Sequence, residues 1–191
     1  DDAVDPTSFT LNNTNFASRM VANIAGGDVT LASKNAAITS ISNWSITSTA
    51  DRNLNFISYG NLNINQNIIH NGSGGRVNMV AGWDGVNGLN PTNGTIDFST
   101  LRLRDVTDTG ILTIAATKRI AVGATTGTGI IAAAADRFTS NNVGNSLIAP
   151  ASRYVIYSTS NGVTTPGTLT PASIAGGYNA YQPSGVPAGN H

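Results

Sequence analysis

Short runs in which apolar and polar residues alternate return along this chain roughly every fifteen to twenty residues. Alternation with a period of two is typical of a β-strand that buries one face. The regular return predicts units that bury their apolar faces by stacking on one another. We interpret the runs as copies of one strand, most of them with a glycine just before; they are residues 29–32, 62–65, 77–80, 95–98 and 112–115.

A second, shorter apolar run follows after a polar bend, at residues 46, 68–69, 101–103 and 119–122. Together the runs predict an all-β fold, a parallel β-helix of about seven or eight coils and roughly 35–40 Å in length. Asn-Gly pairs between alternating strands are also typical of hairpins, so an antiparallel β-sandwich is the alternative. The shared phase of the strands after each glycine favours the parallel stack.

The N-terminal part, residues 1–149, is interpreted as the coils of this β-helix. Residues 1–25 have the weakest pattern and are expected to form either a cap or a first coil, with short strands near 9–11 and 20–24. Residues 130–138 contain a run of alanines, which has high helix propensity. Because this run has the spacing of another coil, it predicts a strand with small inward side chains, with a helical turn as the alternative.

The C-terminal part, residues 150–191, is rich in proline and tyrosine. Its residues 153–158 alternate well enough to predict one further strand. The remainder is expected to be a Pro/Gly-rich extension that packs on the last coil.

Charge is sparse in this chain, at 10% of residues, and ten basic residues balance ten acidic ones. Such a chain has no basic surface for nucleic acid, so we expect no nucleic-acid partner. There is no cysteine, which excludes disulfides and thiolate metal sites. No apolar stretch is long enough to span a bilayer, and the start at Asp1 suggests a mature or excised fragment.

The segment Ile148-Ala149-Pro150-Ala151-Ser152-Arg153-Tyr154-Val155-Ile156-Tyr157-Ser158, with the Gly/Thr/Pro-rich stretch after it, resembles filamentous-haemagglutinin-like large exoproteins. Residues 60–68 and 77–82 look like the coils of the same proteins, which are adhesin passengers of two-partner secretion. The resemblance implies a right-handed parallel β-helix that is secreted or surface-anchored in Gram-negative bacteria. It also implies an outer-membrane transporter as a partner during secretion.

Carboxylates offer the one enzymatic candidate, because parallel β-helices include polysaccharide lyases and hydrolases. Asp97, Asp105 and Asp108 are close in sequence, with Asp84 before them, but turn and surface roles are routine for aspartate among Thr, Ser and Arg. We therefore expect no catalytic residues. We also expect no metal site, since the glycine-rich stretch 72–78 lacks the carboxylate of a calcium repeat and His70 is expected to be a solvated side chain in a polar bend.

Aromatic and asparagine side chains are the remaining candidates for contact and for structure. Trp83, Tyr178 and Tyr181 are the candidate surface or glycan contacts, with core or cap packing as the alternative for each. Asn63, Asn65 and Asn78 alternate with apolar residues, and are candidates for an asparagine ladder in which stacked amides hydrogen-bond from coil to coil.

These observations predict a structural and adhesive segment of a secreted or cell-surface bacterial adhesin, without a cofactor and not an enzyme. The expected partners are a glycan or protein on a host or bacterial surface. One alternative is an extracellular filament or matrix protein that associates end to end through exposed strand edges. Another alternative is a β-helix protein that binds or cleaves polysaccharide.

Overall fold

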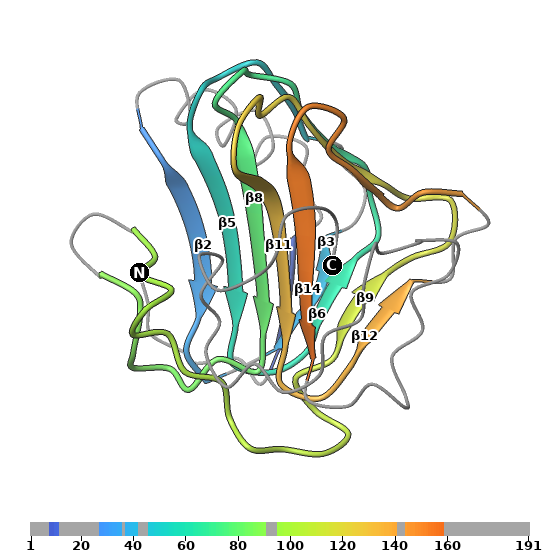
Figure 1. Cartoon of the computed structure of the whole chain (residues 1–191). Helices are drawn as coiled ribbons and strands as arrows, with labels where there is room; N and C mark the ends of the chain where they lie inside the picture. Colours follow the sequence, from blue (N-terminus) through green and yellow to red (C-terminus); the bar gives the residue numbers. More distant parts are fainter. Residues whose placement is uncertain are drawn as a thin grey trace.

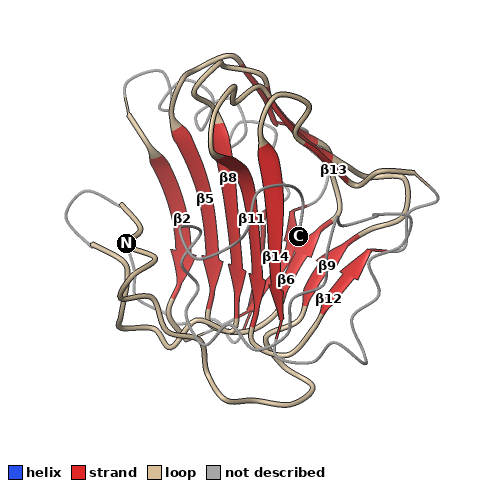
Figure 2. Cartoon of the chain, in the orientation of Figure 1, coloured by secondary structure: helices blue, strands red, loops and turns tan. Residues whose placement is uncertain are grey.

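The computed structural model describes residues 8–11, 27–35, 37–41, 46–90, 95–140 and 144–158. This part of the chain contains strands and no helix (Figure 1, Figure 2), and so no helix that could cross a membrane. The strands are β1 (Ser8–Leu11), β2 (Val29–Ser33), β3 (Ala37–Ile41), β4 (Ile46–Ser48), β5 (Asn53–Ser58), β6 (Leu62–Ile64), β7 (Ile68–His70), β8 (Arg76–Ala81), β9 (Leu112–Ile114), β10 (Ile120–Val122), β11 (Thr128–Ala134), β12 (Phe138–Ser140), β13 (Leu147–Ile148) and β14 (Arg153–Ser158).

These strands form three sheets, which we name by their strand order. Sheet A is β1-β3-β6-β9-β12, sheet B is β14-β11-β8-β5-β2 and sheet C is β13-β10-β7-β4. From β2 onward the chain visits B, A and C in turn, so strands that are neighbours in a sheet come from different passes of the chain. Every pairing between these strands is parallel, which excludes the antiparallel sandwich and agrees with the all-β, parallel prediction.

The predicted period and number of coils were wrong. Residues 29–32 and 77–80 belong to sheet B, whereas 62–65 and 112–115 belong to or adjoin sheet A. Residues 95–98 lie in neither sheet; Ile96 instead makes an isolated antiparallel bridge with Leu89. The fifteen-to-twenty-residue interval therefore mixed strands of two sheets, and the described sheets hold five, five and four strands rather than seven or eight.

The second, shorter runs were placed more accurately. Ile46, Ile68 and Ile120 stand side by side in sheet C, as copies of one position should. Residues 101–103 are the exception, because they lie outside the three sheets and Leu103 bridges to Trp83. The alanine-rich run forms β11, which confirms a strand rather than a helical turn up to Ala134. The single strand predicted for residues 130–138 is otherwise wrong, because residues 135–137 connect two sheets and Phe138 begins β12.

The core lies between the three sheets and is filled by alternate residues of each strand. In the three-residue strands the outer two positions are buried and the middle one is half-buried, as in β6, β9 and β10. Leu54, Phe56 and Val77, from the longer strands, are fully buried and belong to one apolar cluster with the buried residues of these short strands. Burying each such side chain contributes about 1.5–3 kcal/mol relative to exposure, so this inward row is the main source of stability.

Sheet B differs because its three central strands are buried on both faces. In β5, β8 and β11 every residue after the first is buried. The outward side chains Ile57, Val80 and Ile131 belong to a second apolar cluster with Trp83 and Leu101. Strands covered on both faces lose strict alternation, which is why these runs are more continuously apolar than their neighbours.

The strands predicted near the ends of the chain are partly described. Residues 9–11 lie within β1, and residues 153–158 form β14, the edge strand of sheet B beside β11. Residues 20–24, and the extension from 159 to 191, lie outside the described residues.

Candidate functional site

One corner of the stack, where strands of sheet B lead into strands of sheet A, contains a long excursion of the chain. Three residues, 59–61, join β5 to β6, and three residues, 135–137, join β11 to β12. Between β8 and β9 the same three positions are Gly82, Gly110 and Ile111, with residues 83–109 inserted. Side-chain hydrogen bonds between successive strands of sheet B accordingly join residues 23 to 25 positions apart, whereas Asn61 and Asn67 bond residues 50 and 52 positions away, across this segment. We call residues 83–109 the insert.

The two ends of the insert meet. Gly82 and Gly110 both have positive φ angles, 80° and 70°, which glycine adopts without strain. A Cβ placed on either residue would lie 3.0 Å from the Cα of the other, and both positions press against the Ala135 side chain. The chain therefore leaves the stack and returns at one place.

The insert packs over the outer face of sheet B. Its Trp83 and Leu101 are 1% exposed and share a cluster with Ile57, Val80 and Ile131 of the sheet. Half-buried apolar residues complete the cover, and they are Leu89, Ile96, Phe98 and Leu103. In Figure 1 the green and yellow-green segment carrying the insert loops out beside and below the strands of sheet B.

The predicted sugar-stacking role does not fit Trp83 in this structure. Its indole ring is 1% exposed and its Nε1 donates a hydrogen bond of 2.6 Å to the Asn87 carbonyl oxygen. The face of the ring is therefore used in packing, the alternative that the sequence also allowed. Tyr178 and Tyr181 lie outside the described residues.

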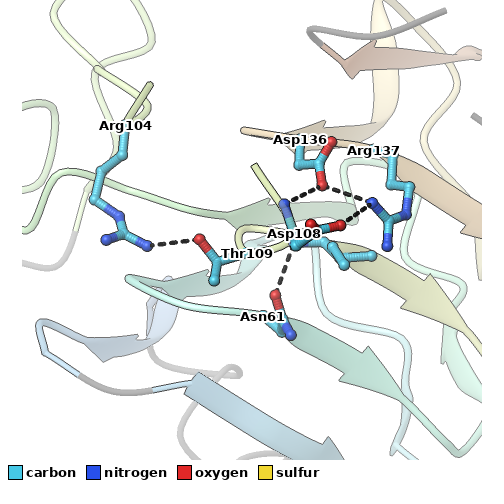
Figure 3. A network of polar contacts seen from close by, with 7 residues as sticks. Asn61, Arg104, Asp108, Thr109, Asp136 and Arg137 are labelled. Atoms are coloured by element: carbon cyan, nitrogen blue, oxygen red, sulfur yellow. Dashed lines mark hydrogen bonds and ion pairs between the residues drawn. The ribbon is translucent and has the colours of Figure 1, made fainter. Parts of the chain in front are cut away.

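A network of polar contacts holds the end of the insert on the neighbouring turns of the chain (Figure 3). Asp136, 5% exposed, accepts hydrogen bonds from the Asp108 backbone N–H at 2.8 Å and from the Arg137 guanidinium at 2.7 Å. Arg137 also reaches the exposed Asp108 carboxylate at 3.3 Å. On the other side, the Asn61 amide oxygen accepts from the Ile111 N–H at 3.0 Å. The turns above and below thus fix the return point of the insert.

Removing the buried charge of this network should weaken the insert's attachment. We expect Asp136→Asn to lower the free energy of unfolding by about 1–2 kcal/mol, because a buried carboxylate loses its charge-assisted bond to Arg137. Asp108→Asn is the matched control and should change it by less than about 0.5 kcal/mol, since that carboxylate is 82% exposed. Urea unfolding of the two variants measures both values, and equal effects would contradict the assigned roles.

A cation–π contact attaches the last part of the insert to the same corner. The Arg104 guanidinium lies 3.9 Å from the centre of the Tyr59 ring, and its Nη2 donates to the Thr109 hydroxyl at 3.4 Å. The Arg104 backbone N–H donates to the Gly82 carbonyl at 2.8 Å. The described part of the insert is therefore attached by contacts of several kinds rather than by packing alone.

Two of the four aspartates that offered an enzymatic candidate, Asp84 and Asp97, are used in turns. Asp97 accepts hydrogen bonds from the Ser99 hydroxyl and N–H and from the Thr100 hydroxyl, which hold the pKa of its carboxyl below the usual value. For Asp84, slight burial opposes the effect, but hydrogen bonds from Asn87 and Val86 still lower its pKa. A carboxylate held ionised in this way is a poor general acid, so neither residue fits that role.

The described residues offer no cluster suited to a metal ion. Asp28, for example, has a structural role, because it accepts two hydrogen bonds of 2.8 Å from the Asn53 backbone and side chain. These bonds join the first residue of β5 to the residue just before β2.

A shallow groove opens between the insert and the end of β2. It encloses 210 Å³ and is lined by Lys34, Trp83, Gly85, Val86 and Leu89. Val86 is 75% exposed and Lys34 is exposed, so the rim presents an apolar side chain and an ammonium group to solvent. The groove is smaller than typical small-molecule pockets. We therefore regard it as a feature of the insert's surface rather than as a catalytic cavity.

Of the three residues predicted to form an asparagine ladder, one, Asn78, makes such a contact. The Asn78 amide donates to the Asn55 amide oxygen at 2.8 Å, and Asn55 donates to the Thr30 hydroxyl at 2.8 Å. Asn55 and Thr30 were not predicted as ladder residues, although Asn55 also alternates with apolar neighbours. Asn63 stands beside Thr113 in sheet A and Asn65 follows β6, and their ladder roles stay predictions.

His70 is not the solvated side chain that its polar neighbours in sequence predicted. It is fully buried, and its Nε2 lies 2.6 Å from the Arg52 carbonyl oxygen. It points inward because it stands two residues after Ile68 in β7, on the same face of the strand.

No protein-family model, curated protein or solved structure matches this chain.

Proposed function

We propose that this chain is a segment of a right-handed parallel β-helix that serves as the structural, adhesive rod of a secreted or surface-anchored bacterial adhesin. The observation that carries the proposal is the order in which the chain visits three parallel sheets, B, A and C, pass after pass. Such a stack is stiff, because every pass is hydrogen-bonded to the next along all three sheets. The resemblance of residues 148–158 to filamentous-haemagglutinin-like exoproteins supports the adhesin role, with that segment ending in β14, the edge strand of sheet B.

The domain division follows from this proposal. Residues 1–149 form the coils, and residues 150–191 add a last strand and an extension that packs on the final coil. An outer-membrane transporter handles the chain during secretion. The partner at the surface is a glycan or protein of a host cell or another bacterium.

The insert is the part of the coil best suited to contact such a partner. Coil geometry does not require it, since the three-residue connection is complete without it, and its exposed face bears Val86 and Arg102. Loops that leave a rigid scaffold are where binding residues concentrate. We therefore assign adhesion to the insert and stiffness to the stack.

Adhesion of coated beads to epithelial cells and to bacteria tests this proposal. We expect saturable attachment of beads carrying the whole chain. The double change Val86→Asp and Arg102→Asp should remove at least about half of it, because exposed apolar and Arg side chains are favoured interface contacts.

A second double variant is the matched control for this experiment. Ala116→Asp and Arg119→Asp make the same change in net charge at two exposed positions between β9 and β10, outside the insert, and should leave attachment normal. The adhesive role would be contradicted if beads carrying the parent chain attached no better than beads carrying an inert protein. End-to-end polymers in electron micrographs, without attachment, would favour the filament alternative.

A further inference from the structure

The inward side chains of sheet C are apolar at most positions, but His70 is an imidazole. His70 is fully buried and lies in register between Ser48 on β4 and Val122 on β10, so it is inside the stack and not at its edge. Gly75 passes close to the ring, since a Cβ there would lie 2.9 Å from the His70 Cδ2. An ionisable ring is therefore buried among mostly apolar inward side chains, with backbone packed close against it.

The hydrogen bonds define the proton on this ring. Nε2 lies 2.6 Å from the Arg52 carbonyl oxygen, and a carbonyl can only accept, so Nε2 carries the hydrogen of the neutral ring. Nδ1 is then the bare nitrogen, and it is buried without a hydrogen-bond partner among the described residues. A second proton would have to bind at Nδ1, where it finds no acceptor.

The charged groups around the His70 ring would do little to stabilise its protonated, positively charged form. The Asp51 carboxylate is exposed and is already bonded to the Gly74 N–H at 2.8 Å and to the Ser73 hydroxyl at 3.2 Å. The Arg52 side chain is exposed, and the Arg76 guanidinium points to the Thr126 carbonyl. The flanking strands β4 and β10 contain no ionisable residue. Burial lowers the pKa of His70, opposed by the Arg52 carbonyl and by Asp51.

We propose that His70 makes the corner formed by residues 50–52 and 70–75 acid-sensitive, so that the corner opens when a proton from solvent binds Nδ1. The open form hydrates the imidazolium, which the closed form leaves as a buried cation with an unpaired N–H. Opening breaks the hydrogen bonds that close the corner, from Asn71 N–H to the Ser48 carbonyl, Gly75 N–H to the Gly72 carbonyl and Gly123 N–H to the His70 carbonyl. The inference does not depend on the adhesin proposal.

The sign of the effect follows from linkage. Because the closed state has the lower pKa, the open state binds more protons, and the closed state loses stability as the pH falls through the ordinary histidine value of about 6.5. If the closed form binds no proton, the closed-to-open ratio falls about tenfold between pH 7.5 and 5.5. Above pH 7.5 the ratio should be constant.

Hydrogen exchange on the whole chain measures this ratio at single amides. We expect the protection factors of the Asn71, Gly75 and Gly123 amides to fall about tenfold from pH 7.5 to 5.5, because they report the open corner. The Leu62 and Leu112 amides, bonded to the Ile111 and Arg137 carbonyls in sheet A, are the internal control and should keep theirs. An equal fall at the control amides would overturn the proposal of local opening.

His70→Gln is the matched variant, because its amide can still donate to the Arg52 carbonyl but cannot titrate in this range. It retains His191, so any response of that residue is common to both proteins. The pH response at the corner should vanish in the variant, and a response equal to that of the parent would overturn the proposal. If the variant does not fold, NMR titration of the parent decides between the outcomes. A His70 ring that titrates at or above pH 6.5 would overturn the proposal. A ring that titrates at lower pH, together with loss of protection at the corner amides, would support it.

Discussion

Replacing Gly82 with alanine should lower the free energy of unfolding by about 2–5 kcal/mol, one of the two largest effects that we expect from a single substitution. A positive φ costs an L-residue about 1–2 kcal/mol. The added methyl would also overlap the Ala135 side chain and crowd the Gly110 backbone, and overpacking a tight site costs about 1–3 kcal/mol more. Urea unfolding monitored by circular dichroism gives the value directly.

Gly127→Ala separates the two contributions. Gly127 has a similar φ of 68°, but a Cβ there would meet nothing closer than the Arg76 guanidinium at 3.9 Å. This control should cost only the conformational part, about 1–2 kcal/mol. In the Gly82→Ala background, Ala135→Gly should recover part of the loss by removing the overlapping methyl. Equal costs at Gly82 and Gly127 would show that the contact between the ends of the insert is not tight.

The second large effect concerns the polar ladder on the outer face of sheet B. Asn55 is 1% exposed and lies in the middle of the ladder, so Asn55→Ala removes two hydrogen bonds and leaves the Asn78 amide and the Thr30 hydroxyl without this partner. We expect a loss of about 2–4 kcal/mol, since a buried group left unpaired costs about 1–3 kcal/mol. Thr30→Ala, at the half-buried end of the ladder, should cost less than about 1.5 kcal/mol.

A double substitution tests whether the cost comes from unpaired groups. Asn55 and Asn78 lie in one row with Ile131 and Val155 of the next strands. Changing both to valine continues that apolar row and leaves no amide unpaired, so the double variant should be more stable than Asn55→Ala. Removing both partners of a buried hydrogen bond is often nearly neutral. A double variant as unstable as the single one would argue for a loss of packing instead.

The sequence predicted individual strands better than it predicted their arrangement. The alternation at 29–32, 62–65 and 77–80 marks real strands because each buries one set of side chains against the core. The period failed because one pass of the chain contains three strands, some only three residues long, and a strand of that length gives little alternation. Residues 95–98 alternate too, but Ile96 and Phe98 pack on the outside of sheet B as part of the insert.

The candidate site was less predictable, for reasons visible at particular residues. Trp83 follows Gly82, and only the fold shows that the chain turns there and packs the ring over sheet B. The polar contacts of Asp136 join residues about thirty positions apart in sequence, a pairing that local pattern does not predict. His70 could have been found: it follows Ile68 by two positions, and the period of two places both on the inner face.

The meeting of Gly82 and Gly110 has a consequence for the evolution and engineering of this fold. The insert leaves and rejoins the coil at neighbouring backbone atoms. The coil should therefore tolerate inserts of other lengths, because the free-energy cost of closing a loop grows slowly with its length. The corner is thus a natural splice point, where foreign segments can be grafted and the stack need not change its spacing. Any graft must still bring apolar side chains to cover Ile57 and Val80. Otherwise the outer face of sheet B would expose an apolar surface that promotes aggregation.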